Sequence, residues 1–482
     1  MKKLTILAVI LLLFAWPLFA TTYYVSTTGN DDDPGTLAEP WQTLAYAVSQ
    51  ISSGDTVYLR AGTWGERLDI TSKSYASRTT FARYPSDPVG SAIIDGTDIT
   101  PFEFEDGVIW VKLSKNVCID GLKVINGNHT GIVLWGPSGS EHNLEVLNCI
   151  TDTTARAGII TFYVDGATIQ YNTIYNSNMP NGGDEVLSIA SSSTNVDVSY
   201  NELYAGDRTL GATGGEGLNI KDGCSYINVH HNLVDMARPD EQESDRYSMG
   251  VDGWDTETHH IYFYNNIVKN GSWGIQYNSE EGGYTHHIYA WNNIISHIGH
   301  GTMHGGGIGF PAYGGSPGIC DYCYWWNNTI YDCYYGFNGN KEELGTGENY
   351  VQNNIIYNSD QADLYFPASD EGDVTCDHNL LSTDPKFIDA VSEDFHLQAD
   401  SPAIEAGATL ADVTDDYDGI ARPQGDDYDI GAYEYEGDTP HNMILKEGVT
   451  VIIGPGGVVI IKEPMAELIA MFSRLTTIGG LT

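Results

Sequence analysis

The chain has 482 residues, of which 65 are Asp or Glu and 22 are Lys or Arg, a formal net charge of −43. A surface of this charge repels nucleic acid and anionic membranes, which excludes both as partners. It would also repel an acidic polysaccharide unless cations bridge the two. Carboxylate and amide oxygens are the ligands that calcium prefers, so calcium is the expected bridge.

The first twenty residues have the pattern of a secretory signal peptide. Lys2 and Lys3 precede an apolar run from Leu4 to Phe14, and the segment ends at Ala20. The run is too short to span a bilayer with its flanks, and the remaining chain offers no other transmembrane candidate. We therefore expect an exported protein without membrane insertion, either secreted or held at the cell surface or in the periplasm.

An amphipathic helix is predicted from Pro40 to Ser52, followed by a strand around 57–60. Its apolar residues fall on one helical face, namely Trp41, Leu44, Ala45, Val48 and Ile51. Such a helix would cap the first strands of an open β stack, whose end otherwise exposes unpaired backbone groups.

A repeated phrase runs through most of the chain: an Asn or Asp two residues before an aliphatic side chain, with apolar residues upstream. Intervals such as 172 to 201 (29 residues) and 201 to 232 (31 residues) indicate stacked units. The segments between are β-branched or aromatic and punctuated by Gly, Asn and Asp, as in strands and turns. The anchor positions are Asp95, Asp120, Asn148, Asn172, Asn201, Asn232, Asn266, Asn293, Asn328, Asn354 and Asn379.

This repeat predicts an all-β fold, a right-handed parallel β-helix in which the anchor Asn side chains stack at one turn. One coil cannot bury its apolar residues alone, whereas stacked coils can. An Asn at that turn would adopt left-handed backbone geometry and bond its neighbours along the stack. The largest insertions precede Asn232, Asn266 and Asn328, and insertions of this kind cluster on one face, often the binding face.

Five segments follow from these patterns: a signal peptide (1–20), an N-terminal cap with the first coils (21–90), the repeats (91–383), a C-terminal β-helix-associated segment (384–435) and a tail (436–482). In the tail, Val449–Ile453 and Val458–Ile461 flank a Gly-Pro-Gly-Gly turn and predict a β-hairpin. A helix is predicted from Pro464 to Leu475. We expect a monomer.

Seven cysteines leave at least one unpaired, or all of them reduced. Cys320, Cys323 and Cys333 are near neighbours that would suit one local disulfide or simple packing. Cys320 and Cys323 also have the spacing of half a zinc site, but no second Cys-x-x-Cys follows.

Two segments carry a resemblance to known proteins. Residues 22–64, TYYVSTTGNDDDPGTLAEPWQTLAYAVSQISSGDTVYLRAGTW, resemble the N-terminal capping segment of many secreted bacterial right-handed β-helix proteins of the pectate-lyase-like superfamily. Residues 384–435 are similar to the C-terminal segment of the same group. The resemblance implies the fold and secretion. It leaves the chemistry open, because β-helices host lyases, hydrolases, epimerases and non-catalytic surface proteins.

A weaker resemblance points to family nine of the polysaccharide lyases. Glu216 in GGEGLNIK is similar to the acid-Gly-aromatic turn of that family, and Asp252 with Asp255 in VDGWDT is similar to its Asp-Asp-Gly-Phe-Asp phrase. The resemblance implies that these three carboxylates hold calcium. Two positions depart from the pattern: Val251 replaces an Asp, and Gln276 in WGIQ replaces the Lys that abstracts the proton.

Lys221 is the alternative base, because it lies on a predicted strand between two coils that carry insertions. β-Elimination from a uronate needs a base for the proton next to the carboxylate, a cation for the negative charge that forms, and a leaving oxygen. The competing interpretation is a Lys that merely neutralises an acidic surface.

The remaining candidate residues bind substrate. Aligning Gly253 with Gly217 and Gly274 stacks Glu216 on Asp252 and turns Trp254 inward; we prefer this register to one that aligns Gly250. It stacks Asn219 with Asp255 and Gln276. Trp135 or Trp273 would stack on sugar rings. The predicted substrate-binding residues are Asn219, Gln276, Asn278, Trp273 and Arg246.

Several other groups have simpler explanations. The pairs His259–His260 and His286–His287 begin seven residues before their anchor Asn, so they should form ladders on adjacent coils. His297, His300 and His304 lie in a Gly-rich insertion, which suits a polar loop, a metal site or a proton donor. Asp415, Asp416 and Asp418 in TDDYDG resemble a structural calcium loop.

The leading hypothesis is an extracellular protein that acts on an acidic polysaccharide by calcium-assisted β-elimination. The second is a non-catalytic carbohydrate-binding or adhesion β-helix, because the Lys phrase is altered. A glycoside hydrolase, with Asp252 and Asp255 as acid and base, or an epimerase is the third.

Overall fold

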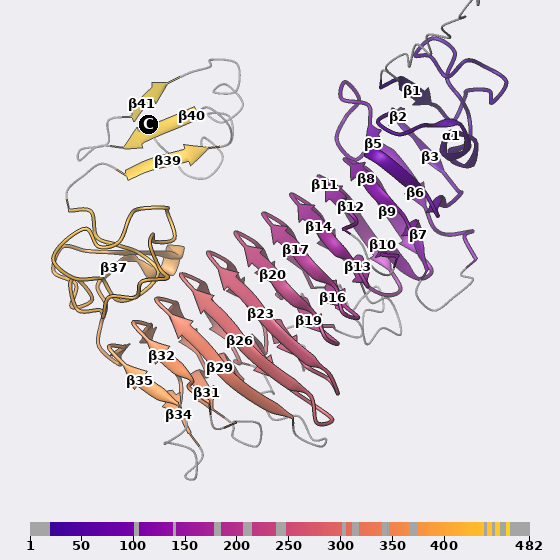
Figure 1. Ribbon diagram of the computed structural model, residues 1–482. Helices are drawn as coiled ribbons and strands as arrows, with labels where there is room; N and C mark the ends of the chain where they lie inside the picture. Colours follow the sequence, from indigo (N-terminus) through magenta and orange to yellow (C-terminus); the bar gives the residue numbers. More distant parts are fainter. Residues whose placement is uncertain are drawn as a thin grey trace, which may run out of the picture.

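Three long parallel sheets, wound around one core, make up the protein. The computed structural model describes residues 20–100, 106–137, 141–177, 185–205, 215–237, 247–300, 305–310, 318–339, 345, 347–366 and 374–437, with backbone strands at 441–445, 449–453 and 459–462. Each coil of the elongated stack adds one strand to each sheet (Figure 1). No helix in this described part is both long and apolar enough to cross a membrane.

Sheet A has 13 parallel strands in the order of the chain. They are β1 (Thr22–Val25), β2 (Thr56–Leu59), β5 (Ser74–Arg83), β8 (Lys115–Asp120), β11 (Leu144–Leu147), β14 (Asp165–Gln170), β17 (Thr194–Ser199), β20 (Ser225–His230), β23 (Glu257–Tyr264), β26 (Tyr284–Trp291), β29 (Ile319–Trp326), β32 (Tyr350–Gln352) and β35 (Thr375–Asp377).

Sheet B follows sheet A in each coil and has 12 strands. They are β3 (Gly62–Trp64), β6 (Ala92–Asp95), β9 (Lys123–Gly127), β12 (Ile150–Thr154), β15 (Thr173–Tyr175), β18 (Glu202–Tyr204), β21 (Leu233–Asp235), β24 (Ile267–Lys269), β27 (Ile294–Ile298), β30 (Thr329–Cys333), β33 (Ile355–Tyr357) and β36 (Leu380–Leu381).

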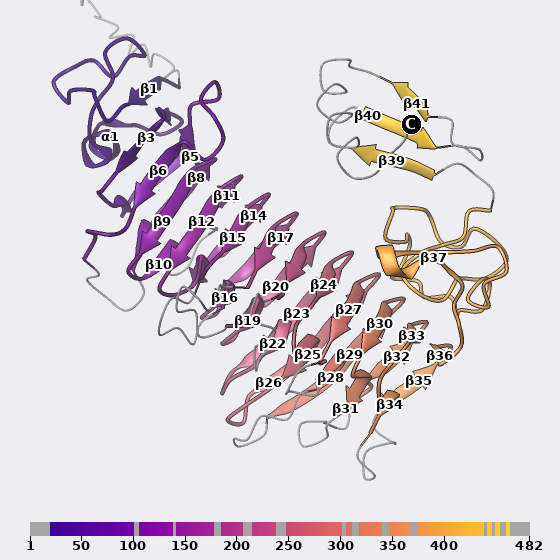
Figure 2. The same ribbon diagram turned by 180° about the vertical axis from the view of Figure 1, so that it is seen from behind.

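Sheet C completes each coil and has 11 strands, several of which are seen beside sheet B in Figure 2. They are β4 (Leu68–Thr71), β7 (Gly107–Lys112), β10 (Thr130–Trp135), β13 (Ile159–Phe162), β16 (Leu187–Ala190), β19 (Leu218–Lys221), β22 (Tyr247–Asp252), β25 (Trp273–Asn278), β28 (Gly306–Phe310), β31 (Tyr335–Gly339) and β34 (Ala362–Tyr365).

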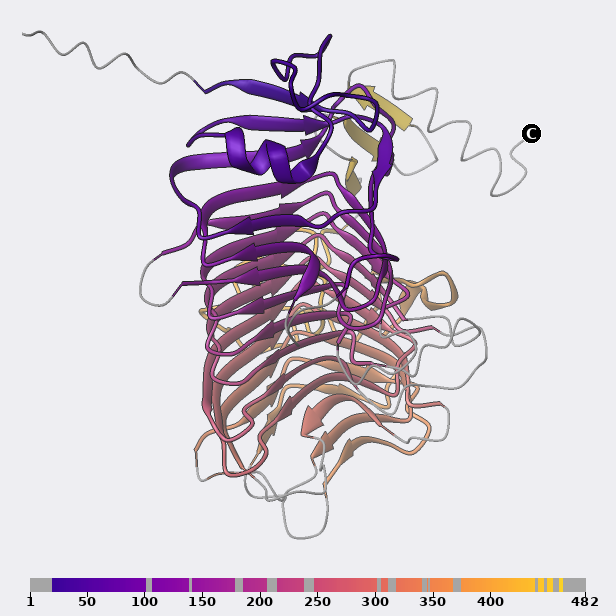
Figure 3. The same cartoon turned by 90° about the vertical axis from the view of Figure 1, so that its right-hand side faces the viewer.

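The N-terminal cap is the helix α1 (Leu44–Gln50), shorter than predicted. Thr43 ends the extended chain and accepts a hydrogen bond from the Tyr46 N–H, which is an N-cap. Ala47, not Ala45, completes the buried face, because Ala47 lies one turn from Leu44 and Ala45 points to solvent. Figure 3, which views the stack from its N-terminal end, shows α1 beside the first coils.

The predicted Asn column is confirmed from Asn172 onward and includes Asn379. Each Asn Nδ2 donates to the Oδ1 of the next Asn along the stack, for example Asn232 to Asn266 (3.0 Å) and Asn266 to Asn293 (2.9 Å). The same Oδ1 accepts from the backbone N–H of the preceding Asn, and each Nδ2 also reaches a carbonyl, such as Val229 O for Asn266. The column thus pairs buried polar groups at the turn between sheets A and B.

Two details of the predicted column are wrong. In the earlier coils the apolar Cys149, whose N–H donates to Asn172 Oδ1, occupies the column position, and Asn148 lies one residue before it. The left-handed residue is also the one preceding each column Asn, as in Asn265 (φ 53°) and Asn292 (φ 52°). That residue turns the chain at the corner, which lets the following Asn side chain enter the stack.

The C-terminal segment, residues 384–437, packs on the outside of the last coils (Figure 1). Its strands β37 (Phe387–Asp389) and β38 (Asp394–Leu397) pair antiparallel, and its apolar residues cover Ile294 and Ile355 of sheet B. A fully buried Arg422–Glu434 ion pair (2.6 Å) anchors it, and Arg422 Nη2 donates to Asn292 Oδ1 (3.2 Å).

The remaining predictions for the fold have mixed outcomes. The His ladders are confirmed, with His260 and His287 stacked at 4.9 Å between ring centroids. All seven cysteines are free and six are buried, so the local disulfide is not formed. In the tail, β40 (Val449–Ile453) and β41 (Val459–Lys462) pair as the predicted hairpin, and β39 (His441–Leu445) pairs with β40 as a third strand. The helix predicted at 464–475 lies outside the described residues.

Removing one Asn from the middle of the column tests its importance. Asn266→Ala leaves donors and acceptors of Asn232, Asn293 and Val229 unpaired in the core. We expect the free energy of unfolding to fall by about 2–4 kcal/mol. Asn128→Ala is the matched control, because the exposed Asn128 makes one bond to Thr97 O (3.0 Å) and should change stability by less than about 0.5 kcal/mol. Chemical denaturation measures both; equal effects would contradict the role of the column.

Candidate functional site

A line of side chains runs along the outward face of sheet C, across neighbouring coils. Inward residues such as Ile220 and Val251 belong to the core, so their strand neighbours face away from it. The strand register aligns Lys221 with Asp252 and Asp252 with Asn278. The whole line, called the sheet C column, consists of Lys112, Trp135, Phe162, Ala190, Lys221, Asp252 and Asn278.

The register predicted from the glycines is wrong in both alternatives. Asn219 aligns with Gly250 and Gln276, and Asp252 aligns with Lys221 rather than with Glu216. Trp254 lies after the strand and is 45 % exposed rather than inward. Met249 and Val251 point into the core instead. The residues that alternate with them along the strand therefore face outward.

Asp252 is the most perturbed carboxyl group of this face. Burial is the largest cause and, together with the nearby carboxylates of Glu280 and Asp222 and against the opposing effect of Lys221, it raises the pKa of Asp252 to about 7. Its Oδ1 accepts from the Trp254 N–H (3.1 Å). With its pKa raised toward neutrality, Asp252 can accept or donate a proton near neutral pH.

Lys221 lies beside Asp252 and forms an ion pair with Glu185, which is buried. Burial alone would lower the pKa of Lys221, but Glu185, Glu216 and Asp222 outweigh it and raise the pKa above its ordinary value. The amine is therefore held in its charged form, with a quarter of the side chain exposed.

Several buried oxygens on this face lack a hydrogen-bond donor. Glu185 Oε2, Asn219 Oδ1, Gln276 Oε1 and Asn278 Oδ1 are all buried and unpaired. The amide nitrogens do have partners: Asn219 donates to Glu216 Oε2 (2.5 Å), and Asn278 donates to Glu280 Oε1 (2.8 Å). The face thus offers acceptors in excess, which suits a cation or a hydroxyl-rich ligand.

The calcium prediction for Glu216, Asp252 and Asp255 stays a prediction. Within the described part of the chain, no three His, Cys, Asp or Glu side chains are grouped so that they could share a metal ion. Asp255 is exposed and follows the strand, whereas Glu216 is buried beside Asn219. The Asp415–Asp418 loop has other partners: Asp416 accepts three backbone N–H groups, and Asp418 contacts His396 (2.8 Å).

The other predicted residues are spread along the same sheet or beyond it. Gln276 is fully buried and donates to Gly306 O (2.9 Å), and Trp273 is half-buried beside Tyr247 at the start of β25. Trp135 contacts Phe162, with ring centroids 5.4 Å apart. Arg246 lies outside the described residues.

The histidines predicted in the Gly-rich insertion have acidic neighbours on the other side of the coil, and His297 lies on β27 rather than in the insertion. His297 contacts Asp332 (2.6 Å), and His300 contacts Asp360 (3.2 Å) and the Asp332 carbonyl (2.8 Å). His304 lies outside the described residues.

Sequence reasoning missed Glu185, Asp222 and Glu280. Glu185 precedes β16 by the same two residues by which Glu216 precedes β19, and these strands pair in register. Aligning consecutive coils on their core residues would have found it. Glu280 comes from the turn after β25 and has no comparable signal.

Comparisons with known proteins agree with this architecture. Residues 23–185 match the Pel9A-like right-handed β-helix region. The chain is 33% identical over 102 residues to uncharacterized protein YwoF of Bacillus subtilis (21% of either chain) and 37% identical over 122 residues to pectate lyase PEL9 of Emericella nidulans (23% of this chain, 29% of that protein). These matches span less than a third of either relative.

Two solved structures resemble the whole solenoid. Pectate lyase Pel9A matches with a TM-score of 0.54 at 14% identity and covers 86% of this chain and 96% of its own. XylC in complex with xylose matches with a TM-score of 0.54 at 11% identity, covering 86% and 98%. At such identities the likeness shows the fold. The protein is a right-handed parallel β-helix of the pectate-lyase-like kind, which confirms the predicted fold class.

The raised pKa of Asp252 predicts a pH-dependent effect on stability. A carboxyl group whose folded pKa lies above its unfolded value of 3.8 destabilises the fold increasingly as pH rises from about 4 to about 7. Asp252→Asn removes this charge, so at pH 8 with a chelator we expect a gain on the order of 2 kcal/mol that vanishes near pH 4. Unfolding curves at the two pH values measure it. The exposed Asp255→Asn is the control; a gain for Asp252→Asn that is the same at both pH values would contradict the assignment.

Proposed function

We propose that the protein binds a uronate-containing polysaccharide along the sheet C column and cleaves it by β-elimination at Lys221 and Asp252. The observation that carries the proposal is the column itself. An aromatic pair, Trp135 and Phe162, lies on the same outward line as the charged pair Lys221 and Asp252, separated by the small Ala190. Sugar rings stack on aromatic side chains, and the charged pair would then face a sugar further along the chain.

The two charged groups suit different parts of the reaction. A carboxyl group with a pKa of about 7 can accept the proton from the carbon next to the uronate carboxylate. The electron pair of that C–H bond forms the new double bond, and the bond from the neighbouring carbon to the glycosidic oxygen breaks. The leaving oxygen then takes up a proton from solvent or from Lys221. The Lys221 ammonium group, held charged by Glu185, would stabilise the negative charge that develops.

This assignment changes the role that the sequence predicts for Lys221. The sequence makes it the base, but an amine whose pKa is raised by Glu185 keeps its proton at neutral pH. Asp252 is the better acceptor, and Lys221 the better partner for the substrate carboxylate.

Calcium belongs to the proposal as a bridging cation. Four carboxyl groups interact with the Lys221 amine, namely Glu185, Glu216, Asp222 and Asp252, and a fifth, Glu280, lies near Asp252. When bound, calcium would neutralise the repulsion between these groups and an acidic chain. Glu216, Asp252 and the unpaired amide oxygens are the residues that would hold it.

Conservative and non-conservative variants separate the two roles. Activity on pectate, alginate and glycosaminoglycans is followed by the ultraviolet absorbance of unsaturated products. Asp252→Asn should reduce turnover by about a hundred- to ten-thousand-fold, as removal of a proton acceptor commonly does. Lys221→Ala should lose most activity, whereas Lys221→Arg, which keeps the charge but cannot act as a base, should retain a large part of it.

Controls and opposing outcomes follow from the structure. Lys269→Ala removes another ion-paired amine. Lys269 lies on sheet B and pairs with Glu393 (2.7 Å), so this variant should leave turnover unchanged. Full loss of turnover in Lys221→Arg would restore Lys221 as the base. Products without unsaturation would indicate hydrolysis. Binding without products would favour the second candidate, a non-catalytic carbohydrate-binding protein, which the replacement of the family's Lys by the buried Gln276 supports.

Calcium is tested separately by stability. The midpoint of thermal unfolding should rise on addition of calcium, and Asp252→Ala should abolish most of the rise, because the cation relieves repulsion centred on that carboxylate. Magnesium at the same concentration controls for ionic strength. An undiminished rise in Asp252→Ala would place the cation at another site.

A further inference from the structure

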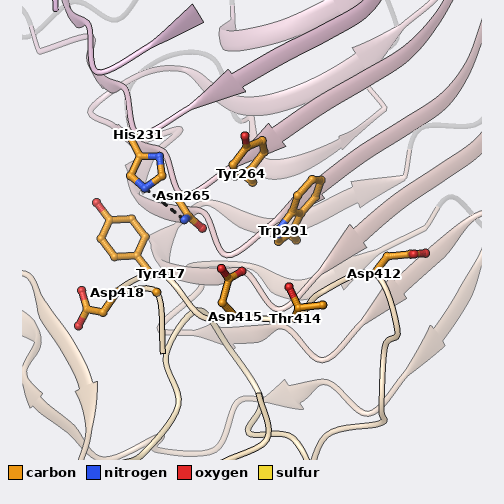
Figure 4. Close-up of a pocket in the computed structure, with 10 residues that line it drawn as sticks. His231, Tyr264, Asn265, Trp291, Asp412, Thr414, Asp415, Tyr417 and Asp418 are labelled. Atoms are coloured by element: carbon orange, nitrogen blue, oxygen red, sulfur yellow. Dashed lines mark hydrogen bonds between the residues drawn. The ribbon is translucent and has the colours of Figure 1, made fainter. Parts of the chain in front are cut away.

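Two adjoining cavities lie on a different sheet, between the outward face of sheet A and the C-terminal segment. The first has a volume of about 400 Å³ and is lined by residues including His231, Asn265 and Asp415. The second has a volume of about 280 Å³. Trp291 and Asp412 line both, so the cavities adjoin each other. Figure 4 shows the first cavity, with strand side chains on one side and the 412–418 stretch on the other.

Aromatic rings form the strand side of both cavities. On this face Tyr264 and Trp291 stack at 4.7 Å with 8° between their planes, as rungs of a ladder. The next position in register is Trp326, which breaks the ladder and instead tilts against Tyr289 at 57°. The second cavity opens at this break, lined by Trp291 and Trp326 together with Tyr262 and Tyr289. Tyr264 covers one face of Trp291. The break in the ladder leaves room for a flat ligand to pack against the aromatic rings that line the second cavity.

The polar groups around the cavities are mostly hydrogen-bond acceptors. Asn265 is 7 % exposed, its Nδ2 contacts His231 Nε2 (3.3 Å), and its Oδ1 is buried without a donor. In Figure 4 the nitrogen of this amide is turned toward His231 and its oxygen away from it. Asp412 and Asp415 are exposed, and within the described residues neither forms an ion pair with a cationic side chain. Burial lowers the pKa of His231 to about 4, helped by His230, so the imidazole is neutral at pH 7.

We propose that these cavities bind two successive uncharged sugar residues of a glycan. Aromatic surface flanked by carboxylate and amide oxygens suits a ligand with apolar C–H faces and hydroxyl donors. Uronates do not fit, because Asp412 and Asp415 would repel them and, among the residues that the structure describes, no Lys or Arg lines either cavity. The site would thus hold a neutral chain, while the sheet C column faces an acidic one.

This inference stands apart from the proposed function. The residues belong to sheet A, the A–B corner and the C-terminal segment, and none of them is part of the sheet C column. Absence of neutral-glycan binding in a protein that still cleaves a uronate-containing chain would overturn this inference alone. Neutral-glycan binding without uronate cleavage would overturn the proposed function alone.

The test measures binding of the full chain to neutral oligosaccharides, namely xylo-, cello- and galacto-oligosaccharides, by calorimetry and intrinsic Trp fluorescence. At least one should bind, and Trp291→Ala should weaken it by at least about tenfold through loss of ring contact. Trp254→Ala, which removes an exposed Trp elsewhere, is the matched control and should bind normally. Should Trp291→Ala prove unfolded by circular dichroism, Asp415→Ala in the exposed stretch provides a second variant and should weaken binding several-fold.

Charged oligosaccharides complete the experiment. Oligogalacturonate and chitosan oligomers should not compete for this site, and Asp412→Asn, which removes a charge but keeps the shape, should change neutral binding by less than about fivefold. Absence of binding by every neutral oligosaccharide, or unchanged binding in both Trp291→Ala and Asp415→Ala, would overturn the inference. Displacement by chitosan oligomers that disappears in Asp412→Asn would also overturn it, in favour of a cationic ligand.

Discussion

The buried Asn column is the interaction on which the rest of the structure depends. Each Asn side chain pairs with the next at 2.9–3.0 Å and also satisfies carbonyl and N–H groups of the tight turn between sheets A and B. Unpaired backbone groups at that turn would be costly in the core. Because an amide can bond only one neighbour in one register, the column also fixes how each coil aligns with the next. Every column of outward side chains inherits its alignment from this constraint.

That alignment brings together charged side chains that lie far apart in the sequence. Strands about 4.8 Å apart bring outward side chains of successive coils close together, although 23–31 residues separate successive members of the sheet C column along the chain. On sheet C the result is the Lys221 ammonium group among four carboxyl groups, with Glu280 near Asp252 and buried acceptors beside them. Burial, together with repulsion from Glu280 and Asp222, raises the pKa of Asp252, and the repulsion makes the face suited to cations and proton transfer.

The C-terminal segment uses the same regularity for a different purpose. The residues that precede the column Asn turn outward, and Asn292, Asn327 and Asn353 bond to carbonyls of this segment. The buried Arg422–Glu434 pair completes the attachment. The segment therefore lies along the corner beside the aromatic ladders, which creates the cavities around Trp291. A solenoid of one repeated coil thus carries two chemically distinct faces, one with the acidic cluster around Lys221 and one aromatic.

The sequence alone determined the features that depend on local pattern. The spacing of Asn172, Asn201 and Asn232 predicted the parallel stack, and alternation of apolar residues predicted strands, because both signals repeat within one coil. The position of the capping helix followed from its apolar face. Lys221, Asp252, Asn219 and Asn278 were also selected correctly as outward polar residues of neighbouring coils.

Only the tertiary structure decided which of these residues meet. The glycines of the three coils allowed two registers, and neither was the one adopted; in the observed register Met249, Val251 and Tyr277 lie in the core. Glu185 joined the cluster from a neighbouring coil, where only alignment of consecutive coils reveals it, and Glu280 joined from a turn without a local signal. Insertions of varying length hide the equivalence of successive coils in the sequence, whereas hydrogen bonding between adjacent strands fixes it in space. The charge state of Lys221 and the cavities beside Trp291 follow from those contacts, and contacts between coils are a property of the fold.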